Sequence, residues 1–68
     1  MNIRQIRQEY DSNYRQMVQL IQQMGGERQI IYHRKKNSHL YKKLRMLQMR
    51  EKMLDEAENR MRMRHAAN

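Results

Sequence analysis

The sequence predicts an all-α protein, a two-helix hairpin or segmented coiled coil whose second helix is long. Three observations support this prediction: Gly25 and Gly26 are the only glycines, proline is absent, and apolar residues recur at helical spacing on both sides of the glycine pair. Glycine tolerates the left-handed backbone conformation that ends many helices, so the pair marks a turn. We expect one structural unit, with a first helix in residues 1–24, a turn at 25–26 and a second helix over 27–66.

The first segment has the pattern of an amphipathic helix. The apolar members of its a/d heptad grid are Ile3, Ile6, Tyr10, Met17, Leu20 and Met24. Asn13 is the polar member of this grid, and a core asparagine can fix the register of paired helices. In the alternative that we favour, Asn13 lies at the edge of the stripe and Tyr14 takes the buried place.

The second segment is expected to be one helix of about 40 residues and about 60 Å. Glu27 near its start and the arginines near its end suit the helix dipole. Its main apolar stripe consists of Leu40, Leu44, Leu47, Leu54 and Met61. A break at Asn37 and Ser38 is the alternative, with Ser38 capping a helix that starts at His39. Continuity is favoured, because Tyr41 lies where a capping box has Glu or Gln.

A second apolar stripe lies nearly opposite the leucines when residues are placed at 100° intervals around one helix. Its members are Ile31, Met46, Met49 and Met53. A hairpin needs only one apolar stripe on each helix. Two stripes on the long helix therefore predict two neighbours, the first helix on one side and another chain on the other. Both stripes are candidate protein-interaction residues.

Positive charge is concentrated directly after the glycines. Residues 1–25 have a net charge of +1 and residues 51–68 of zero, whereas residues 26–50 hold eight basic and one acidic side chain, for +7. Such a block is typical of a surface that binds an anionic partner. The candidate nucleic-acid-binding residues are Arg28, Arg34, Lys35, Lys36, Lys42, Lys43, Arg45 and Arg50. Their spread around the helix favours RNA over DNA; ordinary solvation of a charged surface is the alternative.

Composition argues against several other classes of protein. Cysteine is absent and histidine occurs three times, so disulfides are excluded and a structural zinc site is not expected. No apolar run is long enough to cross a membrane. We find no catalytic constellation and expect no enzyme activity, cofactor, metal or small-molecule substrate. The lack of cysteine favours an intracellular, reducing compartment, without distinguishing cytoplasm, nucleus and organelle matrix.

Three hypotheses about function follow. A chain of 68 residues buries a modest core, which favours stabilisation by a protein partner or by self-association. The leading hypothesis is a small basic helical protein that docks into a larger protein or ribonucleoprotein assembly. The second is an RNA-binding module that uses the basic residues from Arg28 to Arg50. The third is a homodimer in which two hairpins complete a four-helix bundle.

Overall fold

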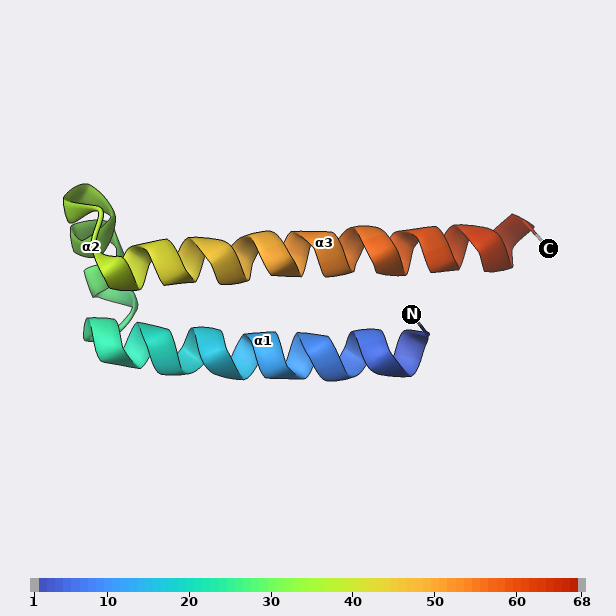
Figure 1. Ribbon diagram of the computed structural model, residues 1–68, viewed down its shortest axis with the longest axis horizontal. Coiled ribbons are helices and arrows are strands. Elements are labelled where there is room, and N and C mark those ends of the chain that lie inside the picture. Colours follow the sequence, from blue (N-terminus) through green and yellow to red (C-terminus); the bar gives the residue numbers. More distant parts are fainter. Residues whose placement is uncertain (1, 68) are drawn as a thin grey trace.

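The computed structural model describes the backbone of residues 2–67 and the side chains of residues 2–64. All regular structure in this range is helical, which confirms the predicted all-α class. The elements are α1 (Ile3–Met24), the 3-10 turn η1 (Glu27–Gln29), α2 (Ile30–Lys36) and α3 (His39–Ala67). The long helices α1 and α3 run antiparallel, and α2 lies at the end of the molecule where the chain reverses (Figure 1). We call this end, residues 25–38, the closed end.

The helix α1 begins and ends with recognisable caps. At its start, the Asn2 side chain accepts a hydrogen bond from the Gln5 backbone, and the Gln5 side chain accepts one from the Asn2 backbone, forming a capping box. At its end, Gly25 has a φ of 106°. Its N–H donates to the Gln22 carbonyl at 3.1 Å, and the Gly26 N–H donates to the Ile21 carbonyl at 2.9 Å. This is the Schellman pattern, and its left-handed residue is the expected glycine.

The expected continuous helix over residues 27–66 is wrong, because the chain breaks at Asn37. This residue is left-handed, with φ 50° and ψ 46°, and the Ser38 N–H donates to the His33 carbonyl at 3.0 Å. The Ser38 hydroxyl then caps α3 by accepting from the Tyr41 backbone N–H at 3.1 Å. Because Tyr41 has no side-chain carbonyl or carboxylate, the second hydrogen bond of a capping box, to the Ser38 backbone, is absent. The bond from the Tyr41 N–H to the Ser38 hydroxyl is sufficient for a serine cap.

The break shortens the molecule and creates a third helix. The longest dimension is 48 Å, compared with about 60 Å for a continuous second helix of 40 residues. A two-helix hairpin is therefore too simple a description of this chain. The short helix α2 turns away from the axis of α3 at the closed end (Figure 1).

His33 connects the three segments that meet at the closed end. Its Nε2 atom lies 3.1 Å from the Met24 carbonyl oxygen, and its Nδ1 atom lies 2.9 Å from the Ser38 hydroxyl. A carbonyl oxygen can only accept, so Nε2 donates to Met24, and in the neutral ring Nδ1 then accepts from the Ser38 hydroxyl. This side chain thus satisfies a carbonyl at the end of α1 and orients the residue that caps α3.

The core lies between α1 and α3 and is small. Leu20, Met24 and Leu44 form its centre near the closed end, and Ile6 and Leu54 are buried as well. Partly buried side chains surround the centre: Met17, Ile21, Ile30, Leu40, Tyr41 and Leu47. Because few side chains exclude water, each of them contributes a large share of the stability.

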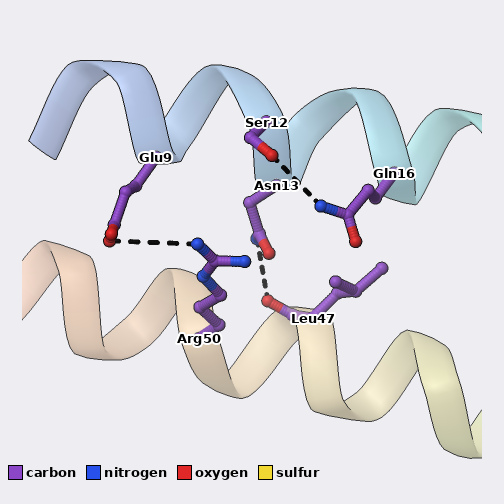
Figure 2. Close-up of polar contacts among 6 residues, drawn as sticks. All are labelled: Glu9, Ser12, Asn13, Gln16, Leu47 and Arg50. Carbon is purple, nitrogen blue, oxygen red and sulfur yellow. Dashed lines mark hydrogen bonds and ion pairs between the residues drawn. The ribbon is translucent and has the colours of Figure 1, made fainter. Parts of the chain in front are cut away.

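The favoured interpretation of Asn13 is also wrong. Asn13 is 1% exposed, whereas Tyr14 is 69% exposed. The Asn13 Nδ2 atom donates to the backbone carbonyl of Leu47 on α3 at 2.9 Å (Figure 2), while its buried Oδ1 atom has no hydrogen-bond partner among the described residues. Asn13 therefore ties α1 to one position along α3, the role of a register-setting core asparagine.

Candidate interaction surfaces on helix 3 and at the closed end

The leucine stripe of α3 is occupied within the chain. Leu44 and Leu54 are buried, and Leu40, Leu47 and Met61 are half-buried. Leu40, Leu44 and Leu47 pack in the cluster that holds Leu20 and Met24 of α1. These side chains are not free to receive a second protein without displacing α1.

The opposite side of α3 carries an uncovered apolar surface, which we call the methionine face: Met46, Met49 and Met53. Their exposed fractions are 70%, 60% and 68%. Ile31, which was grouped with them, is also exposed but belongs to α2. Ile31 shares a helical face with the methionines only if residues 27–66 form one helix. Because the chain breaks at Asn37, Ile31 and the methionines lie on separate helices. The methionine face is therefore a feature of α3 alone.

A shallow groove runs along the methionine face and has oppositely charged ends. It is lined by Arg45, Gln48, Met49, Lys52, Met53 and Glu56. The Arg45 Nη1 atom donates to the Gln48 side chain at 3.2 Å. Lys52 and Glu56 belong to neither of the two apolar stripes nor to the predicted nucleic-acid-binding residues. Positions 45, 49, 52 and 56 have the spacing of one helix face. This spacing is the signal that places Lys52 and Glu56 beside the methionines.

The eight predicted nucleic-acid-binding residues, which we call the basic block, lie in η1, α2 and the first part of α3. Seven are exposed and Arg50 is half-buried. Arg50 is also the one that has an acidic partner among the described residues, with 3.9 Å between its Nη2 atom and the Glu9 carboxylate (Figure 2). The Lys36 ammonium lies 4.7 Å from the centre of the Tyr32 ring, a cation–π contact. Most of the block's charge is thus directed at solvent.

The next part of α3 is acidic. Glu51, Asp55, Glu56 and Glu58 lie within two turns, and Glu58 pairs with Arg62 at 2.5 Å. Tyr10 of α1 donates a hydrogen bond to the Asp55 carboxylate. This bond, together with desolvation and the negative charges of Asp55 and Glu58, raises the pKa of Tyr10 well above its ordinary value. Through its hydrogen bond to Asp55, Tyr10 links the two long helices at a point far from the closed end.

The described residues contain no group of three or more His, Asp or Glu side chains placed to hold a metal ion. Within the same part of the chain, no helix is long and apolar enough to cross a membrane. The features that stand out are therefore two surfaces, the methionine face with its groove and the basic block, which extends from the closed end into the first part of α3. Both are suited to contact with macromolecules.

Comparison with known proteins identifies no relative. No protein-family model, no curated protein and no solved structure matches this chain. The geometry and chemistry of these two surfaces are therefore what points to a function.

Proposed function

We propose that this chain is a small, non-catalytic interaction protein that docks into a larger protein or ribonucleoprotein assembly. One observation carries the proposal: α3 is apolar on two sides, and α1 covers only one of them. The three side chains of the methionine face are each at least 60% exposed. Burying apolar surface contributes roughly 25 cal/mol per Å², so a partner that covers this face gains stabilisation without disturbing the core.

The chemistry of the face supports a protein partner. Methionine is unbranched and polarizable, and it adapts its shape to irregular surfaces. The basic block includes Arg45 at one end of the groove, and among the described side chains only its Arg50 pairs with an acid, Glu9. Unpaired cations next to an apolar surface increase the rate of encounter with acidic partners and orient them.

The proposal can be tested by measuring the size of the native complex that contains the full chain. After mild cross-linking in the source cells, gel filtration compares the wild-type chain with Met49→Glu. We expect the variant to leave the assembly and elute at lower mass, since a carboxylate in an apolar interface costs several kcal/mol. Circular dichroism of the purified variant is expected to show unchanged helicity.

Met63→Glu is the matched control. Met63 is 71% exposed on the same helix but lies about 15 Å along α3 from Met53. The Met63→Glu variant should therefore elute at the same mass as the wild type. If the complex is unchanged for Met49→Glu, Met49 does not contact a partner, which contradicts the proposal. If the isolated variant unfolds, Met49 belongs to the core, which also contradicts it.

RNA binding through the basic block is the second candidate function. The observation that favours it is that seven of the eight block residues have no acidic partner among the described side chains. Phosphate contacts make affinity fall steeply with salt. Replacing Arg34, Lys35, Lys36, Lys42 and Lys43 with Gln should therefore weaken binding to single-stranded RNA and flatten its salt dependence.

Fluorescence anisotropy between about 50 and about 200 mM salt measures both effects. A control in which Lys52, Arg60 and Arg64 are replaced with Gln removes charge from the other part of α3. If the five-residue variant binds RNA as tightly as the wild type, the basic block is not an RNA site.

A further inference from the structure

The groove along the methionine face has a charge pattern that is complementary to itself. Arg45 lies at one end and Glu56 at the other, eleven positions apart in the sequence. Eleven residues make about three turns, so the two side chains lie on the same side of α3 with about 16 Å between their levels. When two copies of such a groove face each other antiparallel, the basic end of each meets the acidic end of the other.

We propose that the partner covering the methionine face is a second copy of this chain, packed antiparallel through α3. The inference rests on the proposed docking function of that face and names its occupant. In this dimer the two-fold axis crosses α3 at the level between Arg50 and Glu51. Arg45 of each copy then lies beside Glu56 of the second copy, which makes two equivalent ion pairs, as in an isologous interface.

The same register brings the apolar side chains together. Met49 and Met53 lie on opposite sides of the axis and nearly equally far from it, so Met49 of one copy packs beside Met53 of the other. The Lys52 side chain borders the groove. Its methylene groups extend over the methionine contact while its ammonium stays in water. The contact thus has an apolar centre and a charged rim, the usual anatomy of a protein interface.

The charge distribution along α3 also selects the antiparallel orientation. Residues 39–50 contain four basic and no acidic side chains, and residues 51–58 contain four acidic and one basic. Antiparallel packing places each basic segment beside an acidic one. It also holds the two closed ends about 35 Å apart, several Debye lengths at physiological salt. The +8 charge of each chain therefore does not prevent association.

The geometry distinguishes this dimer from other arrangements. In a four-helix bundle both long helices of each copy face the partner, whereas the groove with Met49 and Met53 is lined by α3 residues alone. Two copies instead form a flat row in the order α1, α3, α3, α1. An anionic polymer or membrane is a poorer occupant of the groove, since Glu56 repels phosphate at one end of it.

The test uses the full chain and a charge exchange. Sedimentation equilibrium from about 5 to about 500 μM is expected to show a monomer–dimer equilibrium for the wild type. Arg45→Glu and Glu56→Arg should each weaken dimerisation by at least about tenfold, because each places like charges together twice. Mixing these two variants restores opposite charges at both pairs, so the mixture should dimerise as strongly as the wild type.

Lys43→Glu is the matched control, since it reverses an exposed charge on α3 outside the groove and should dimerise like the wild type. A wild-type chain that stays monomeric at the highest concentration, or a variant mixture that does not associate, overturns the inference. If the purified chain is monomeric but still enters a complex in cells that depends on Met49, the partner is another protein. That result overturns the homodimer and leaves the proposed docking function in place. A pure dimer whose cellular complex ignores Met49→Glu overturns the proposed function.

Discussion

Helix α3 has two apolar sides, one buried and one exposed. On one side Leu44 and Leu54 are almost completely buried, and on the other Met46, Met49 and Met53 stay mostly exposed. Hydrophobicity does not separate them, since leucine and methionine have similar transfer free energies. The difference arises from what lies opposite: α1 presents Leu20 and Met24 to the leucine side, and no described element covers the methionine side.

The comparison shows that an apolar stripe marks a contact without saying whether the contact is internal. Leucine has few well-defined rotamers and packs uniquely, whereas methionine adapts to varied surfaces. On the buried side, Asn13 of α1 also donates a hydrogen bond to the Leu47 carbonyl of α3, which ties the two helices at one position. The leucine side is therefore held against α1 in one register, and the methionine side is left available for a partner.

Leu44→Ala should break this contrast most severely. Leu44 is 1% exposed, and removing its branched side chain from a small core is expected to lower the free energy of unfolding by about 2–5 kcal/mol. Urea denaturation followed by circular dichroism at low protein concentration measures the loss, so that self-association does not add to stability. A loss below about 1 kcal/mol would show that the leucine side is not the core.

Asn13→Leu tests the polar anchor and should act in the opposite direction. The buried Oδ1 atom of Asn13 has no hydrogen-bond partner among the described residues, which costs about 1–3 kcal/mol. Replacement by leucine should therefore raise the free energy of unfolding by about 1–2 kcal/mol. Ser12→Leu, at the exposed position directly before Asn13, is the control and should have little effect. Lower stability of Asn13→Leu would mean that the bond to Leu47 outweighs the orphaned oxygen.

Asn37 sets the direction in which α3 leaves the closed end, and two substitutions test this role. Its φ of 50° suits glycine better than any other residue, so Asn37→Gly should raise the free energy of unfolding by a few tenths of a kcal/mol to about 1. Asn37→Ala should lower it by about 1 kcal/mol. Thermal unfolding compares the pair. If alanine stabilises the chain, residues 27–66 form a continuous helix in solution.

Met49→Ala should have the smallest effect on the fold. Because Met49 is 60% exposed, the free energy of unfolding of the dilute chain should change by less than about 0.5 kcal/mol. The same denaturation experiment that detects Leu44→Ala measures it. A loss as large as that of Leu44→Ala would mean that both sides of α3 are buried in the isolated chain.

The sequence alone determined the all-α class, the helix end at Gly25 and the leucines that pack against α1. These features follow from local rules. Glycine accepts a positive φ at no steric cost, and helical spacing places leucines on one side of α3. The exposure of Met46, Met49 and Met53 also follows from this spacing, once another stripe occupies the core.

Only the tertiary structure decided that α3 starts at His39, that Asn13 is buried and that Tyr14 is not. Asn37 is a weaker helix terminator than glycine, and its left-handed turn is supported by His33, which joins Ser38 to the Met24 carbonyl at the end of α1. Asn13 is buried because the Leu47 carbonyl, 34 positions away, accepts its hydrogen bond. The cap at Ser38 and the place of Asn13 on the heptad grid are local signals, but the choice between the alternatives depends on contacts with another helix. That choice is therefore made only when the helices are packed.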